Sequence, residues 1–175
     1  MDDSKSVLED GLSLPSNFAY LTDQSDPESK QWKTQMAKVH NDIYGGNYTL
    51  NDVQVKSYKL TIKKGDHELG LFGPRSGIPE GVILCRYLGE KVKIDKVNDE
   101  RFAAEGDKTG IIYSEFKGNI ARFINSCGKD KQKVNVKFYE SFGSIYVATS
   151  QRVAASGELL MDYDPTPPAG SFLFV

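Results

Sequence analysis

The feature that most constrains this chain is that its apolar residues, from Val53 onward, occur in short runs interrupted by glycine, proline and charged residues. Many of these runs alternate apolar with polar positions or are rich in β-branched and aromatic residues, as is typical of strands. The strand-like segments are VQVKSYKLTI at 53–62, LGLF at 69–72, GVILCRYLGE at 81–90, TGIIYS at 109–114 and VNVKFYESFGSIYVATS at 134–150. We expect a mainly β fold with few helices (α+β), a turn at Phe142–Gly143 and a last short strand at 158–163.

One segment before these strands has helical periodicity instead. Asp26 can cap a helix here, Pro27 suits its first turn, and Gly45–Gly46 is predicted to end it. Four apolar residues fall on one face of this helix: Trp32, Met36, Val39 and Ile43. We expect this face to pack against a sheet.

The composition excludes several classes of protein. The chain has 175 residues, enough for one ordinary domain, and a net charge of −2, which does not favour direct binding of nucleic acid. It contains no apolar run long enough to span a membrane. Its two cysteines, Cys85 and Cys127, are far apart and have no histidine at ligand spacing, so we expect buried thiols and no zinc or other metal site.

The most specific stretch is GNIARFINSC at 118–127. It is too apolar for an ordinary loop, yet Asn119, Arg122 and Asn125 give it more hydrogen-bonding groups than a core strand needs. We expect Asn119 to be a turn or capping residue. The other two polar side chains are candidates for contact with a ligand.

Four segments, in this order, resemble the SET domain of protein lysine methyltransferases. They are ELGLFGPRSGIPEGVILCRYLGE at 68–90, GNIARFINSC, Asn135 and GELLMDYD at 157–164. The resemblance implies a fold of short sheets with a knot-like crossing near the C-terminus, which would place Asn125 beside Tyr163. It also implies a division into a polar arm at 1–30, a helical flank at 31–52, a catalytic domain at 53–164 and a tail at 165–175 expected to close the active site.

The resemblance implies S-adenosylmethionine (SAM) as cofactor and a protein lysine as substrate. The residues expected to bind SAM are Glu68, Leu69, Gly70, Leu71, Arg122, Phe123, Asn125, Ser126 and Tyr163. The residues expected to line the lysine channel are Tyr87, Met161, Phe138 and Tyr113. Tyr163 is expected to be the main catalytic residue, with Tyr87 as the second catalytic wall.

These residue types suit the chemistry. An amide such as that of Asn125 can bind adenine, Arg122 can bind a carboxylate, and Gly70 lets a backbone approach the cofactor. A lysine with an ordinary pKa of about 10.4 must lose its proton before it can accept a methyl group. An apolar channel favours this because burial disfavours the charged amine.

Some features depart from the family pattern and keep alternatives open. Glu68 stands at a family glycine, and Ser126 stands where the family has histidine. The carboxylate of Glu68 either contacts the cofactor's ammonium end or points to solvent. Met161 lacks a hydroxyl, which favours transfer of more than one methyl group.

A histone tail is the substrate that family membership suggests first. The alternatives are a non-histone protein substrate and a catalytically inactive SET-like module that binds a peptide or partner. We expect a monomer in an intracellular location, and the nucleus or chromatin if the substrate is a histone.

Overall fold

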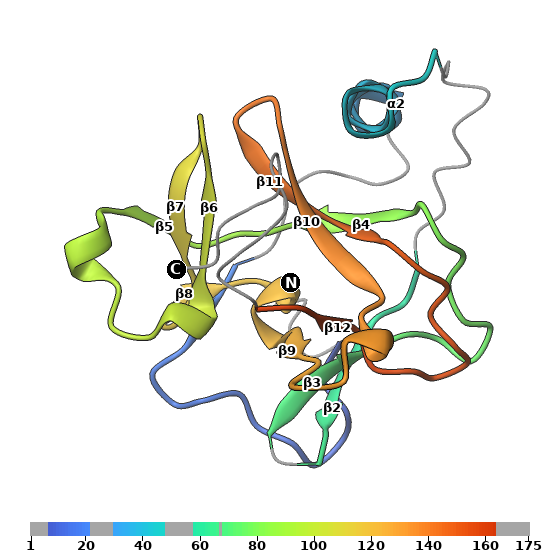
Figure 1. Ribbon diagram of the computed structural model, residues 1–175. Helices are drawn as coiled ribbons and strands as arrows, with labels where there is room; N and C mark the ends of the chain where they lie inside the picture. Colours follow the sequence, from blue (N-terminus) through green and yellow to red (C-terminus); the bar gives the residue numbers. More distant parts are fainter. Residues whose placement is uncertain (1–6, 22–29, 48–57, 67, 164–175) are drawn as a thin grey trace.

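A computed structural model of the chain describes residues 7–21, 30–47, 58–66 and 68–163. Within these residues, five small sheets and the loops between them surround a common core (Figure 1). This arrangement confirms the expected mainly β architecture. Short 3-10 helices lie between the strands, at Ile94–Lys96, Glu100–Phe102, Ile120–Phe123 and Lys131–Lys133.

The largest hairpin supplies one wall of the core. Strands β10 (Val136–Ser141) and β11 (Ser144–Thr149) are antiparallel and turn at Phe142–Gly143, as predicted. Strand β4 (Ile83–Arg86) adds to β11, so the sheet order is β10-β11-β4. The apolar face of α2 (Lys30–Tyr44) packs beside this sheet, against Tyr146 and Ile83, which confirms the predicted helix stripe.

A second sheet of three strands lies apart from the first in Figure 1. Its order is β5-β7-β6, with bounds Glu90–Val92, Gly110–Tyr113 and Ala103–Gly106. The β6 strand is not among the strands expected from the sequence, because alanine and glycine carry little strand signal. Its two alanines are buried, so tertiary packing and not propensity places the strand here.

Three two-stranded pairs complete the fold. They are β2 (Thr61–Lys64) with β3 (Leu69–Phe72), β1 (Ala19–Tyr20) with β8 (Lys117–Gly118), and β9 (Asn125–Ser126) with β12 (Leu160–Met161). The β12 strand is shorter than the predicted strand at 158–163. The proposed N-cap at Asp26, the residues 53–57 and the tail at 165–175 lie outside the described residues.

The centre of GNIARFINSC is a 3-10 helix with a short strand on either side. Asn119 caps this helix by accepting a hydrogen bond from the backbone nitrogen of Ala121, which confirms its expected role. Its side chain also donates to the carbonyl oxygen of Arg86, at 2.8 Å. The stretch is therefore fixed against β4 just before Arg122 and Asn125.

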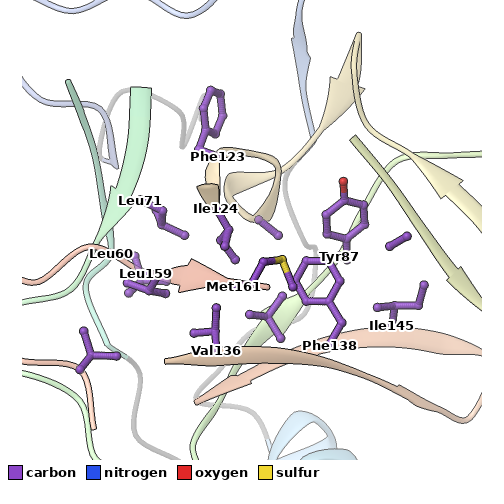
Figure 2. Packing of buried hydrophobic residues seen from close by; sticks show 14 of the residues in the cluster. Leu60, Leu71, Tyr87, Phe123, Ile124, Val136, Phe138, Ile145, Leu159 and Met161 are labelled. Carbon is purple, nitrogen blue, oxygen red and sulfur yellow. The ribbon is translucent and has the colours of Figure 1, made fainter. Parts of the chain in front are cut away.

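The main core lies between the hairpin and the paired strands β9 and β12. Figure 2 shows Met161 and Ile124 in this core, near the rings of Tyr87 and Phe138. Both Met161 and Ile124 are almost fully buried. Tyr87, Ile124, Phe138 and Met161 come from four segments of the chain, so the core holds these segments together.

Candidate functional site

The site forms where two segments far apart in sequence run side by side. In the parallel pair of β9 and β12, Asn125 is opposite Leu160 and Ser126 is opposite Met161. The backbone nitrogen of Cys127 also donates to the carbonyl oxygen of Met161, at 2.8 Å. This pairing brings Tyr163 close to the 3-10 helix that precedes Asn125, which is the convergence expected from the sequence.

A cavity of about 290 Å³ opens beside this pair of strands. Its volume is near the lower end of the range of about 300–1,000 Å³ that is usual for small-molecule sites. It is lined by Asp66, Glu68, Arg101, Phe102, Arg122, Asn125, Ser126, Cys127, Lys133, Glu158, Leu160 and Tyr163. Three acidic and three basic side chains therefore surround the cavity, which suits a ligand that carries both signs of charge.

Asn125 is held at the wall of this cavity by its side-chain nitrogen. Nδ2 donates to the carbonyl oxygen of Leu69 at 3.2 Å and to Oε1 of Glu158 at 3.0 Å. The first bond ties Asn125 to β3, and the second ties it to the segment that leads into β12. Residues from three distant parts of the chain thus meet at one amide group.

Arg122 places a partly buried cation in the same cavity. Its guanidinium carbon lies 4.2 Å from the ring centre of Phe102, 4.9 Å from that of Phe18 and 5.0 Å from that of Phe123. One terminal nitrogen donates to the carbonyl oxygen of Glu115 at 3.2 Å, whereas the buried Nε has no hydrogen-bond partner among the described residues. Burial lowers the pKa of Arg122, but a guanidinium stays protonated in proteins. The site therefore holds a positive charge with unused hydrogen-bonding capacity.

A narrow constriction adjoins the cavity. It is lined by Tyr87, Arg101, Ala103, Ala121, Arg122, Ile124, Phe138, Met161 and Tyr163, and it has no room for a water molecule. The cavity and the constriction share Arg101, Arg122 and Tyr163. Three of the four residues predicted to line a lysine channel, Tyr87, Met161 and Phe138, thus lie in one place.

Tyr87 forms a fixed wall of the constriction. Its ring centre lies 4.9 Å from that of Phe138, and its hydroxyl lies 2.5 Å from Oγ of Ser114 and 3.0 Å from the carbonyl oxygen of Phe102. Burial raises the pKa of Tyr87, and the hydrogen bond with Ser114 only partly opposes this effect. Tyr87 is therefore a neutral phenol whose hydroxyl already has protein partners.

Tyr163 is the second phenol at the constriction. Its hydroxyl donates to the carbonyl oxygen of Ile124. Burial is the main cause that raises the pKa of Tyr163, and the nearby Tyr87 adds to the effect. The side chain thus presents a neutral hydroxyl group on the wall that both spaces share.

Several of the residues predicted for the site do not line the cavity or the constriction. Leu71 and Phe123 lie in the apolar core and do not line the cavity, while Leu69 contributes its carbonyl oxygen to Asn125. Tyr113 lines neither the cavity nor the constriction. Its hydroxyl accepts hydrogen bonds from the backbone nitrogens of Asn98 and Asp99 and donates to Glu115. The structure therefore does not bring Tyr113 together with the other proposed channel residues.

Glu68 lies at the cavity, with its carboxylate 3.8 Å from a terminal nitrogen of Arg101. Arg101 in turn binds Asp99 at 2.7 Å. Sequence reasoning gave no role to Arg101, because it comes from a charged segment without a recognisable motif. It also gave none to Glu158, although this residue is part of the GELLMDYD segment.

Asn135 matched the family pattern without an assigned role, and the structure shows what it contacts. Its Oδ1 accepts from the backbone nitrogen of Leu160, and its Nδ2 donates to the carbonyl oxygen of Glu158, both at 2.9 Å. Asn135 therefore joins the start of β10 to the segment that leads into β12.

These features define a class of β-rich domain in which a strand near the C-terminus, β12, pairs with the earlier strand β9 beside a cavity. Residues 20–164 match the model of the SET domain family. The chain belongs to the SET domain family.

Relatives and solved structures agree with this assignment. The chain is 27% identical over 126 residues to human histone-lysine N-methyltransferase SETD1A, a match that covers 65% of this chain and 7% of that relative's length. The methyltransferase domain of human PR domain-containing protein 2 superposes with a TM-score of 0.51 at 21% identity, covering 63% of this chain and 80% of the other. Arabidopsis thaliana SUVH6, solved in complex with SAM, superposes with a TM-score of 0.50 at 17% identity. The match covers 67% of this chain and 30% of the SUVH6 chain.

Within the described ranges, no helix combines the length and apolar character needed to span a bilayer. In the same ranges, His, Cys, Asp and Glu side chains form no group of three that could hold a metal ion.

Proposed function

We propose that this chain is a SAM-dependent protein lysine N-methyltransferase. The observation that carries the proposal is the joining of a charged cavity to a narrow, water-free constriction through the shared wall of Arg101, Arg122 and Tyr163. A methyl transfer between two large substrates needs such a layout, because cofactor and amine must enter from different sides and meet at one point.

The cavity residues fit the cofactor. SAM, when bound, supplies a methyl group on a positively charged sulfur, and its amino-acid end carries an ammonium and a carboxylate. The guanidinium of Arg122, which lines the cavity, suits the carboxylate. The oxygen of the Asn125 amide and the carboxylate of Glu68 suit groups that donate hydrogen bonds or carry positive charge.

The constriction residues suit a neutral lysine. Met161, Phe138 and the ring of Tyr87 exclude water, so they disfavour a charged ammonium and lower the pKa of a lysine placed between them. The hydroxyl of Tyr163 donates its proton to the carbonyl oxygen of Ile124, and a hydroxyl oxygen can also accept a hydrogen bond, here from an N–H of the substrate amine. This contact would orient the nitrogen lone pair toward the methyl group. The lysine proton leaves to bulk water before the amine enters the constriction.

A histone tail is the substrate that we propose first, because SETD1A is named a histone-lysine N-methyltransferase. The nucleus or chromatin would then be the site of action. A non-histone lysine is the alternative substrate. Because Met161 brings no hydroxyl to the constriction, we also propose that more than one methyl group is added.

One observation favours a second function. The constriction has no room for water, so an amine can enter only if the surrounding side chains move. A SET-like module that binds a peptide or partner without catalysis would need no such movement.

The experiment combines calorimetry and labelling. Titration with SAM should release or absorb measurable heat, and incubation with isotopically labelled SAM, a histone panel and a cell lysate should give labelled lysines by mass spectrometry. The degree of methylation is read from the same spectra. Absence of both heat and label would support the silent module and contradict the proposed enzyme.

A further inference from the structure

The amide of Asn125 is fixed by two acceptors on its nitrogen side. A side-chain amide has two donor hydrogens on nitrogen and an acceptor oxygen. Nδ2 faces the carbonyl oxygen of Leu69 and the carboxylate of Glu158, so both hydrogens have protein partners. Rotating the amide by half a turn would place its oxygen against two acceptors, which is repulsive. Only Oδ1 is therefore left for a ligand, and Asn125 can accept but not donate a hydrogen bond there.

Gly70 provides the space for this contact. A Cβ atom built at Gly70 would lie 2.3 Å from Oε1 of Glu158 and 3.2 Å from Nδ2 of Asn125. Gly70 is not among the glycines with a positive φ, so no unusual backbone conformation requires glycine here. The requirement is steric, and it concerns the carboxylate and the amide.

The backbone around Glu158 is held independently of its side chain. Glu158 forms a bridge with Phe72 of β3, and its carbonyl oxygen accepts from Nδ2 of Asn135. The next residue, Leu159, donates its backbone N–H to the carbonyl oxygen of Leu71 at 2.8 Å. Replacing the carboxylate should therefore leave the main chain in place and change chiefly the contact with Asn125.

We propose that Glu158 is a positioning residue, which uses the space above Gly70 to hold the Asn125 amide with its oxygen available to the cofactor. This inference rests on the proposed function, since it assumes that the cavity binds SAM. It gives Gly70 a role different from the one expected from the sequence. The glycine admits the carboxylate of Glu158, whereas the earlier expectation was a close approach of backbone to cofactor.

The first test compares SAM binding by calorimetry for variants of the full chain. Glu158→Ala should weaken binding by about tenfold or more, because the amide loses one of the two acceptors that fix it. Glu158→Gln keeps an oxygen that can accept from Nδ2 and should stay within about threefold of the native protein. Glu90→Ala, at an exposed residue of β5, is the control and should bind normally. Equal damage from Gln and Ala, or normal binding by Glu158→Ala, would overturn the proposal.

The second test is a double-mutant cycle. Gly70→Ala should fold, because the atom nearest to the new Cβ is the far end of a flexible glutamate side chain that can move away. It should then weaken SAM binding as Glu158→Ala does, and the double variant should be no worse than the worse single variant. Additive losses would show that the two residues act separately and would overturn the proposal.

The third test needs no cofactor. The side-chain amide signals of Asn125, identified by their loss in Asn125→Ala, should shift and exchange faster with solvent in Glu158→Ala, but not in Glu158→Gln. Unchanged signals in Glu158→Ala would overturn the inference even if the enzyme is active. Failure of the native chain to bind SAM, with the amide signals responding as expected, would contradict the proposed function and leave the amide orientation confirmed.

Discussion

The phenol of Tyr163 donates a hydrogen bond to the main-chain carbonyl oxygen of Ile124, a residue 39 positions earlier in the chain. This bond links the segment after β12 to the end of the 3-10 helix that carries Arg122. The hydroxyl lies at the wall shared by the cavity and the constriction. In the proposed mechanism it donates to Ile124 and accepts from the substrate amine.

Replacement of Tyr163 by phenylalanine should therefore affect turnover more than binding. The ring would still close the site, but the acceptor for the substrate amine would be lost. We expect kcat to fall about a hundredfold, as for the loss of one catalytic hydrogen bond elsewhere. SAM affinity, measured by calorimetry, should change by about twofold or less, since the lost contact is made to the amine. An equal loss of affinity and turnover would contradict the assigned role.

The two buried phenols should make the free energy of unfolding decrease at alkaline pH. Burial raises the pKa of Tyr87 and of Tyr163 in the folded state above the ordinary value of about 10. Their contribution to stability is fully present below the unfolded pKa and decreases as pH rises beyond it, because only the unfolded chain can then ionise readily. Urea unfolding at pH values on both sides of about 10 should show this decrease, and Tyr87→Phe should reduce it.

Near-ultraviolet absorbance of tyrosinate provides an independent check of the same prediction. Removing Tyr87 or Tyr163 should leave the absorbance increase around pH 10 of the folded protein unchanged. A smaller increase in either variant would mean that the phenol ionises normally in the folded protein.

Asn135 should contribute to stability through its two side-chain hydrogen bonds to Glu158 and Leu160. Asn135→Ala leaves a carbonyl oxygen and a backbone N–H without these partners. We expect a loss of about 1–3 kcal/mol in the free energy of unfolding, measured with urea. The control is Asn98→Ala, at an exposed asparagine, which should change stability by less than about 0.5 kcal/mol. Equal effects of the two substitutions would contradict the role given to Asn135.

Phe142 is a position at which a substitution should stabilise the protein. It occupies a hairpin turn with φ of 47°, is 64% exposed, and precedes Gly143 with φ of 73°. Asparagine adopts this left-handed conformation more easily than phenylalanine and forms the Asn-Gly pair preferred in such turns. Phe142→Asn should therefore raise the free energy of unfolding by about 1 kcal/mol. A lower Tm for Phe142→Asn than for the native protein would show that the exposed ring makes a stabilising contact.

The sequence predicted those elements whose signals are local. The hairpin around Phe142–Gly143, the strand at 69–72 and the helix stripe each carry their own periodicity or turn chemistry, and the structure confirms them. Asn119 could be recognised as a cap because capping is a contact with a residue two positions away. Local signals survive folding where no tertiary contact opposes them.

Elements that depend on distant partners were harder to predict. The strand at 103–106 has little intrinsic preference and forms because its partner, β7, lies beside it. Tyr113 appeared to be a channel residue, yet the register of β7 directs its hydroxyl to Asn98 and Asp99. A strand register is set by pairing, and the sequence of one strand alone does not contain it.

The sequence by itself determined the family and the segments that meet beside the cavity, because motif identity and spacing are written in the chain. The tertiary structure decided how those side chains are oriented. It showed that Glu158 holds the nitrogen side of the Asn125 amide and that Gly70 provides the room for this contact. The physical reason is that hydrogen-bond direction and steric fit depend on atoms brought together from distant segments, so they exist only once the chain has folded.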